Sequence, residues 1–375
     1  MKAPIWIARP GELSQMVKTL SQQPILAVDT EANSLHAYRE QVCLIQYSTP
    51  TQDFLVDPFA LRDLSSLGAI FQNPRIEKVF HAAEYDIIGL KRDYGFTFAN
   101  LFDTMVAARI LGRTAVGLGS MLEAEFGIVL DKRFQRANWG QRPLPPALLA
   151  YARLDTHYLI ALRDRLKDEL IAANRWELAQ EDFARLTRTP AGHSNGAENN
   201  DEGCWRVAGN HQLTPQQNAV LMELCAYRNR QAEHANLPLF KVLGNATLLA
   251  IAETLPASLA DLSDIEGLSP RLIDRHGVAL LAAVQRGLQT APLTRPRHPH
   301  PDDALLARLD ALRNWRKKMA RQLEVESDVI LPRDTLESIA QANPRTLDQL
   351  QEAMRDLPWR FERYGEQILK VVQGV

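Results

Sequence analysis

The sequence of 375 residues has little cysteine and no long hydrophobic run, and both absences narrow the classes of protein that it can encode. Its three cysteines, Cys43, Cys204 and Cys225, lack the paired spacings of a disulfide framework or a zinc site. No run of about 18 apolar residues is present, and the N-terminus lacks the apolar stretch of a signal peptide. These absences predict a soluble cytoplasmic protein with reduced thiols and no membrane partner.

The chain also lacks an excess of charge of either sign. Its 43 Lys and Arg residues nearly balance its 45 Asp and Glu residues, for a formal net charge of -2. Nucleic-acid-binding proteins usually carry a net positive charge, and this sequence as a whole does not. No Gly-x-x-x-x-Gly-Lys-Ser/Thr loop occurs either, which argues against a helicase-type ATPase.

The first half of the sequence alternates between strand and helix patterns. Short runs rich in apolar and β-branched residues predict strands at 25–29, 42–47, 54–57 and 78–81. Helical spacing follows at 61–71 and 84–94, and Asp103 is a suitable N-cap for a helix that begins at Thr104. Strands followed by strand–helix alternation predict an α/β domain with a mixed sheet and flanking helices.

Two breaks in the pattern divide the chain into domains. One is small, polar and without periodicity, and the other is rich in proline, which favours an extended spacer. The predicted divisions are an α/β domain at 1–190, a linker at 191–212, a helical domain at 213–290, a spacer at 291–301 and a second helical domain at 302–375.

The two helical domains repeat one another at a fixed offset of 88 residues. This offset superposes Arg228 on Arg316 and Leu248 on Leu336. Further matching pairs are Thr247/Thr335, Ile251/Ile339, Ala252/Ala340, Leu259/Leu347, Leu262/Leu350, Pro270/Pro358, Arg275/Arg363 and Gly277/Gly365. Apolar and turn residues are those that a shared helical core would retain, so the pattern predicts a tandem pair of domains.

Two acidic residues end the first predicted strand. Asp29 and Glu31 are two positions apart, so their side chains leave the same face of a strand. Such a pair suits a hard cation, because Mg²⁺ and Mn²⁺ take oxygen ligands. A solvated strand end would carry the same residues, and the pair alone leaves both interpretations open.

Two later motifs supply further acidic residues that could join Asp29 and Glu31 in a metal site. Asp86 falls in the first turn of a predicted helix, where the helix dipole alone also accounts for an acid. Tyr151 and Asp155 are four positions apart and share one face of a helix, as a metal ligand and a group that orients an attacking water would. A simple Tyr–Asp hydrogen bond explains this pair as well, and a satisfied strand-end histidine explains His81.

Together, these acids occur in the order and contexts of the DEDDy 3′→5′ exonucleases, and the sequence resembles the ribonuclease D family. The stretches that carry the resemblance, some shared with the nuclear-exosome exonuclease, are 78–86, 101–104, 142–145 and 151–159. The helical repeats resemble HRDC domains. The resemblance implies an RNase H-like mixed β-sheet flanked by helices, followed by two all-α helical bundles. Ala32 departs from the Phe that many relatives carry after Glu31, which bears on how the terminal nucleotide is held.

The resemblance also implies a phosphodiesterase that uses two divalent cations, Mg²⁺ or Mn²⁺. Asp29 would bridge both ions, Glu31 and Asp155 would complete the site near the attacking water, and Asp86 would support the second ion. Tyr151 would orient the water, and the products would be nucleoside 5′-monophosphates. Apart from the resemblance, crowded acids raise one another's pKa values unless cations neutralise them, which itself predicts a divalent metal.

Local basic clusters supply candidate contacts with nucleic acid, in spite of the balanced net charge. One cluster interleaves basic and aromatic side chains, which suits phosphate binding and base stacking; another gives the last repeat a basic helix face. The candidate residues are His81, Lys132, Arg133, Arg136, Trp139, Arg313, Arg316 and Lys317. A solvated loop or helix face with packed aromatics explains the same residues.

The predicted function is 3′→5′ trimming of RNA that has a free 3′ end. The resemblance implies tRNA precursors and other structured RNA as substrates. A DNA-directed repair or proofreading exonuclease is the alternative, although the lack of an ATPase or polymerase segment favours RNA. A non-catalytic nucleic-acid adaptor ranks last, because every metal ligand is present. Tandem modules on one chain need no second copy, so a monomer is expected.

Overall fold

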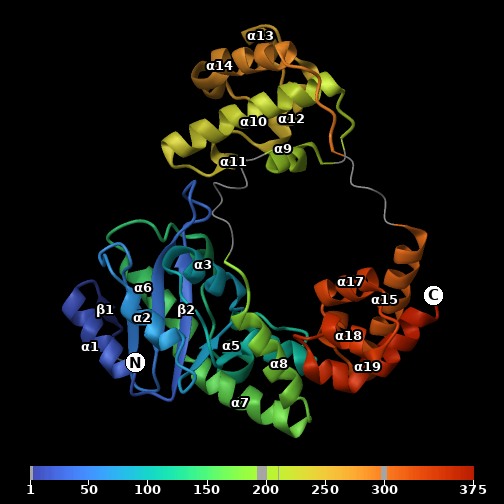
Figure 1. Ribbon diagram of the computed structural model, residues 1–375. Helices are drawn as coiled ribbons and strands as arrows, with labels where there is room; N and C mark the ends of the chain where they lie inside the picture. Colours follow the sequence, from blue (N-terminus) through green and yellow to red (C-terminus); the bar gives the residue numbers. More distant parts are fainter. Residues whose placement is uncertain (1–2, 192–200, 210, 297–301) are drawn as a thin grey trace. The chain divides into compact units, whose positions relative to one another are not determined.

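The computed structural model describes residues 3–191, 201–209, 211–296 and 302–375, which divide into two compact units (Figure 1). The first unit comprises residues 1–31, 42–191 and 300–375. The second comprises residues 32–41 and 192–299. The α/β domain and the second helical repeat therefore belong to one unit, and the first helical repeat belongs to the other together with a short segment from the α/β region.

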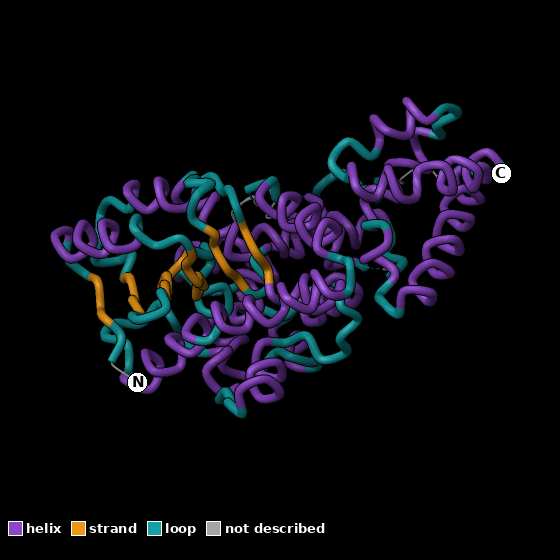
Figure 2. The backbone as a smooth tube through the Cα atoms, turned by 90° about the horizontal axis from the view of Figure 1, so that it is seen from below, coloured by secondary structure: helices purple, strands orange, loops and turns teal. Residues whose placement is uncertain are grey.

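The strands form one mixed sheet (Figure 2). They are β1 (Ile5–Ile7), β2 (Ile25–Ala32), β3 (Val42–Ser48), β4 (Asp53–Val56), β5 (Glu77–Phe80) and β6 (Leu101–Asp103). Their order in the sheet is β1-β4-β3-β2-β5-β6. β1 is parallel to β4, β2 is parallel to β5 and β5 to β6, whereas β3 is antiparallel to β4. Because β2 lies in the middle, its end is surrounded by other elements.

Helices accompany this sheet along the chain. They are α1 (Pro10–Leu20), α2 (Ser65–Phe71), α3 (Glu84–Tyr94), α4 (Thr104–Ile110), α5 (Leu118–Phe126), α6 (Pro146–His157), α7 (Leu159–Ala172) and α8 (Trp176–Thr187), with a 3₁₀ helix, η1 (Lys132–Arg136). Asp103 caps α4 as predicted, since its side chain accepts from the amides of Met105 and Val106.

Both faces of the sheet are buried, because successive residues of a strand point to opposite faces. Leu26 and Val28 of β2 join an apolar core that includes residues of α1, α2 and α3. Ala27 points the other way, into a core built with α4, α7 and α8. The same alternation carries Asp29 and Glu31 to the face of Ala27, so two carboxylates leave one side of an otherwise apolar strand.

The first helical repeat folds around its own core in the second unit. Its helices are α9 (Asp201–Ala208), α10 (Pro215–Ala235), α11 (Leu239–Val242), α12 (Asn245–Thr254), α13 (Leu259–Ser263) and α14 (Pro270–Gln289). Thr214 and Gln217 form a capping box that begins α10. Tyr38, from the segment 32–41, joins this core, and its amide donates to Asn236 Oδ1 at 3.2 Å.

The second helical repeat has the same plan. Its helices are α15 (Asp303–Leu323), α16 (Ser327–Ile330), α17 (Arg333–Ala342), α18 (Leu347–Ala353) and α19 (Pro358–Gln373). Positions related by the 88-residue offset are buried in both cores: Leu248 with Leu336, and Ile251 with Ile339. The long helices α10 and α15 correspond to one another at this offset, as do α14 and α19, which end the two repeats.

A buried ion-pair cluster joins the second helical repeat to the α/β domain within the first unit. The side chain of Arg360 is 0% exposed, and its Nη1 lies 2.6 Å from Glu181 Oε1 and 2.8 Å from Asp182 Oδ1. Glu181 Oε2 also accepts a hydrogen bond from the amide of Trp359 at 2.6 Å, in the first turn of α19. Charges this deep are tolerated only when each is paired, so the cluster fixes α19 against α8.

The structure differs from the sequence-based expectations at a few places. β1 was not predicted, and residues 201–208, placed in the linker 191–212, form α9, whose Cys204 and Ala208 enter the core of the first helical repeat. Residues 192–200 and 210 of that linker, and 297–301 of the predicted spacer, lie outside the described residues. Among the described helices, none has the length and apolar character needed to cross a membrane.

Replacing Arg360 with methionine should lower the unfolding free energy of the first unit by about 3 kcal/mol or more, because two carboxylates would lose their buried partner. Urea unfolding of the full chain, followed by circular dichroism, measures this. Arg188→Ala is the control, since it breaks an ion pair with Asp356 that is more than half exposed and should cost less than about 1 kcal/mol. Equally small effects of both substitutions would contradict the conclusion that the Arg360 cluster fixes α19 against α8.

Candidate active site

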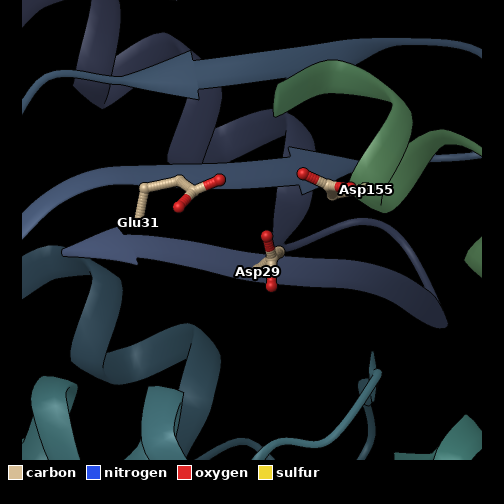
Figure 3. Close-up of side chains that lie close together, drawn as sticks. All are labelled: Asp29, Glu31 and Asp155. Carbon is tan, nitrogen blue, oxygen red and sulfur yellow. The ribbon is translucent and has the colours of Figure 1, made fainter. Parts of the chain in front are cut away.

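Three predicted acids come together at the end of the central strand. Carboxylate oxygens of Asp29, Glu31 and Asp155 all lie within 4.8 Å of one another. Figure 3 shows Asp29 and Glu31 leaving the same strand and Asp155 reaching toward them from a helix. Oxygen-only donors at this spacing fit a hard divalent cation such as Mg²⁺ or Mn²⁺. Residues more than 120 positions apart in the sequence therefore form one candidate metal site.

Helix α6 brings Asp155 to this cluster and is held in place by its opposite face. Arg153 Nε donates to Asp53 Oδ2 at 2.6 Å, and His157 Nδ1 lies 3.0 Å from the same carboxylate. Asp53 begins β4, so these contacts fix the helix to the sheet. Tyr151 and Asp155 lie one turn apart on the other side, as their spacing predicted.

Asp86, on α3, lies beside the cluster and is held by β2, the strand that carries Asp29 and Glu31. Its Oδ1 accepts hydrogen bonds from the amide and the hydroxyl of Thr30, at 3.0 and 2.5 Å. Thr30 stands between Asp29 and Glu31, so one strand supplies two candidate ligands and anchors a further acid. Asp86 is buried and is not among the three carboxylates that share the 4.8 Å cluster.

The start of α3, which positions Asp86, depends on Asp103. The Asp103 carboxylate accepts from the amides of Ala82 and Ala83, at 3.2 and 2.7 Å, in addition to capping α4. Ala82 adopts a positive φ of 59°, which is unfavourable for alanine and sets a sharp turn between β5 and α3. The sequence indicated the cap but not this second use of the same carboxylate.

Gln46 is a site residue that the sequence analysis missed. It is fully buried on β3, and its Nε2 donates to Asp29 Oδ2 at 3.3 Å. An amide donor on one oxygen orients the Asp29 carboxylate toward the cluster. The one available signal was a glutamine inside the otherwise apolar run of β3, which only becomes informative once β3 is known to lie next to β2.

Burial and mutual repulsion raise the pKa values of these acids. Burial is the largest cause for each, and the pKa of Asp29 is raised further by Asp155 and that of Glu31 by Asp29. The pKa of Asp86 is raised by burial and by Asp29, and that of Asp155 rises to about 8 through burial and Asp86. Without cations the cluster resists full ionisation, and bound cations would remove that penalty.

Tyr151 lies at the same site and packs against aromatic neighbours. Burial, and then the charge of Asp155, raise the pKa of its phenol above the ordinary value. Its ring lies 5.6 Å from that of Phe134 and 6.2 Å from that of Trp139. Trp139 is 1% exposed, so the prediction that it stacks on a base is wrong, and the residue instead supports Tyr151 from below the surface.

His81 has a defined hydrogen-bonding role next to the α3 turn. The Thr104 hydroxyl donates to the carbonyl of Phe80 at 3.1 Å, so its oxygen accepts from His81 Nδ1 at 2.9 Å. Burial lowers the pKa of His81, which favours the neutral ring protonated on Nδ1. Its buried Nε2 has no hydrogen-bond partner in the described structure, so the satisfied strand-end histidine considered from the sequence holds for Nδ1 alone.

The other predicted nucleic-acid contacts have mixed environments. Arg133 is exposed and pairs with Asp131, and Arg136 is exposed, whereas the side chain of Lys132 lies outside the described residues. In the last repeat Arg313 is exposed and pairs with Asp310, and Lys317 is exposed. Arg316 is half-buried, and its Nη1 donates to the carbonyl of Leu331 at 2.9 Å. The expectation that Arg316 shares an exposed basic face is therefore wrong.

In the absence of divalent cations, the stability of the first unit should fall as the pH rises from about 5 to about 8. Over that range the folded chain keeps a proton on Asp155, with its pKa of about 8, which the unfolded chain has released, so a higher pH favours unfolding. Thermal melts in EDTA across this range measure the effect. Asp155→Asn should reduce the fall of the melting temperature with pH. If the melting temperature of the wild type falls no more steeply than that of the variant, the raised pKa of Asp155 is contradicted.

Family models and relatives agree with this geometry. The model described as 3′-5′ exonuclease matches residues 4–171, which contain the whole acidic cluster and Tyr151. The HRDC domain model matches residues 217–284 and 306–372, which are the two helical repeats. Both matches confirm the domain types that the resemblance implied.

Individual relatives also match this chain, two of them over nearly their full length. Ribonuclease D of Pseudomonas paraeruginosa is 32% identical over 379 residues, covering 98% of this chain and 97% of its own. The crystal structure of Escherichia coli RNase D, described as an exoribonuclease involved in structured RNA processing, covers 100% of this chain and 99% of its own, with a TM-score of 0.70 and 25% identity. The exosome complex exonuclease RRP6 of Saccharomyces cerevisiae is 41% identical over 173 residues, which cover 46% of this chain and 24% of its own. The chain therefore belongs to the ribonuclease D family of 3′-5′ exoribonucleases.

Proposed function

We propose that this chain removes nucleotides one at a time from the 3′ ends of structured RNA, tRNA precursors among them, and releases nucleoside 5′-monophosphates. The observation that carries the proposal is the convergence of Asp29, Glu31 and Asp155 within 4.8 Å, beside Asp86 and Tyr151. Relatives named ribonuclease D and RRP6 favour RNA over DNA as the substrate class. The proposed setting is the cytoplasm, with the chain acting as a monomer.

The proposed cofactors are two divalent cations, Mg²⁺ or Mn²⁺. Asp29, Glu31 and Asp155 would hold them directly, and Asp86 would support them from beside the cluster. The donor set fits, because every ligand is a carboxylate and the pKa values of all four acids are raised in the absence of a neutralising charge. Cations bound here would stabilise the charge that develops on the entering and leaving oxygens.

Tyr151 acts on the attacking water as a hydrogen-bonding group. Its raised pKa keeps the phenol protonated at neutral pH, so it orients the water and does not remove its proton. The packing of Phe134 and Trp139 against its ring restricts the positions that the hydroxyl can take. Helix α6 thus supplies a ligand and an orienting group from one rigid face.

The direct test follows the shortening of a 5′-labelled structured RNA with a free 3′ end and of a DNA of the same sequence. Wild-type protein with Mg²⁺ or Mn²⁺ should shorten the RNA stepwise, and EDTA should abolish the reaction. Asp29→Asn should lower the rate by at least about 10²-fold, because it removes the charge of the proposed bridging ligand.

Tyr151→Phe is the matched variant, since it keeps every carboxylate. It should slow the reaction by about 10²-fold while leaving its dependence on the cation unchanged. Cleavage that persists in EDTA or in Asp29→Asn would contradict the metal assignment. Preferential shortening of the DNA would favour a DNA-directed exonuclease instead.

A further inference from the structure

Two of the three cysteines lie side by side in the first helical repeat. Cys204 is on α9 and Cys225 is on α10, and both are buried in the core of that repeat. Both are thiols, and they share a hydrogen bond with one another. Thiols in such contact can form a disulfide with little movement of the backbone, whereas thiols on distant elements cannot.

Cys204 also lines a cavity that the exonuclease mechanism does not use. The cavity lies within the second unit, where the segment 32–41 meets α9, α10, α11 and α12, and has a volume of about 370 Å³. Phe240, which is 57% exposed, lines it as well, so the cavity reaches the surface of the repeat. Cys225 is 0% exposed and is not among the described lining residues. A small oxidant that enters the cavity therefore meets Cys204 first.

The guanidinium of Arg228 lies near both thiols and supplies a positive charge. Burial lowers the pKa of Arg228, and the neighbouring Cys225 and Cys204 oppose this shift. Asn245 holds the guanidinium in place, since Arg228 Nη1 donates to its Oδ1 at 2.6 Å. A cation beside a thiol favours the thiolate, which is the form of cysteine that reacts with oxidants.

The hydrogen bond between the two thiols gives them different roles. It is the largest cause of the raised pKa of Cys225, followed by burial. Cys225 therefore keeps its proton and donates it toward Cys204, so Cys204 is the thiol that ionises first and that faces the cavity. Cys43 differs from both: it belongs to the first unit, and burial raises its pKa to about 12.

The second helical repeat shows that the shared core does not need this pair of thiols. At the offset of 88 residues, the counterpart of Cys225 is Arg313, which is exposed, and that of Cys204 is Pro292, which precedes the repeat. Among the described helices of the second repeat, none corresponds to α9. The thiols thus lie at the junction between an additional helix and the core that the two repeats have in common.

We propose that Cys204 and Cys225 form a reversible disulfide when the protein meets a peroxide, and that this bond fastens α9 to α10. The proposal stands on the contact between the thiols, the access to Cys204 through the cavity and the neighbouring charge of Arg228. It does not depend on the exonuclease activity.

The reaction has two steps and consumes one peroxide. The thiolate of Cys204 attacks hydrogen peroxide: an S–O bond forms, the O–O bond breaks, and the leaving hydroxide takes up the proton that Cys204 released. The sulfur of Cys225 then attacks the sulfenic sulfur of Cys204: an S–S bond forms, the S–O bond breaks, and the leaving hydroxide takes up the proton of Cys225. Two thiols are oxidised to a disulfide and the peroxide is reduced to two waters.

The test exposes the folded full chain to hydrogen peroxide, alkylates the remaining thiols in denaturant and maps the cysteines by mass spectrometry. Wild type should yield a linked Cys204–Cys225 peptide pair with Cys43 alkylated, and dithiothreitol should restore alkylation of all three cysteines. In Cys225→Ala, Cys204 should stop at the sulfenic acid, which dimedone labels. Cys43→Ala is the matched control and should form the same disulfide as wild type.

The proposal is overturned if all three cysteines of wild type stay alkylatable under conditions that oxidise free glutathione, or if the disulfide that forms includes Cys43. Hydrogen exchange tests the fastening of α9. Amides of α9 should exchange at least about tenfold more slowly in the oxidised than in the reduced protein, while those of α15 exchange equally in both. Equal exchange of α9 in the two forms would overturn the fastening. None of these measurements involves RNA or divalent cations, so their outcome is independent of the proposed exonuclease.

Discussion

Mutual repulsion among buried carboxylates is the constraint around which the α/β domain is built. Asp29, Glu31, Asp86 and Asp155 come from a strand and two helices, and each raises the free energy of ionising its neighbours. They stay together because other groups hold the elements that carry them. Asp53 fixes α6, Asp103 fixes the start of α3, and Gln46 and Thr30 orient individual carboxylates. Residues outside the carboxylate cluster thus maintain a geometry that bound cations would make favourable.

The two helical repeats illustrate how a duplicated fold acquires two roles. Their cores retain the same apolar positions, whereas the faces that correspond to one another have diverged. The second repeat carries Arg360 and three aspartates, which attach it to the α/β domain. The first repeat has leucine at 272 in place of Arg360, lacks those aspartates, and packs with residues 32–41, the segment that directly follows Glu31.

Much of the fold and of the acidic site was predictable because both depend on local sequence patterns. Period-two and helical spacing located β2, β3 and α3, and the 88-residue offset located the repeats. Gln46 could not be found in this way, since its function depends on which strand lies beside β2. Trp139 and Arg316 were misassigned for a related reason: a basic or aromatic residue in a polar stretch has the same local pattern whether it faces solvent or supports a neighbour. Burial is a tertiary property, and spacing alone does not report it.

The central claim is that the carboxylate cluster binds the cations that the reaction needs. Counting the Mn²⁺ ions bound to the full chain, from the loss of the free-ion signal in electron paramagnetic resonance, tests it most directly when wild type and Asp29→Asn are compared. The account predicts two ions per wild-type chain at saturation and the loss of at least one in the variant, because Asp29 would be the ligand that both ions share. Equal numbers of bound ions in the two proteins would contradict it.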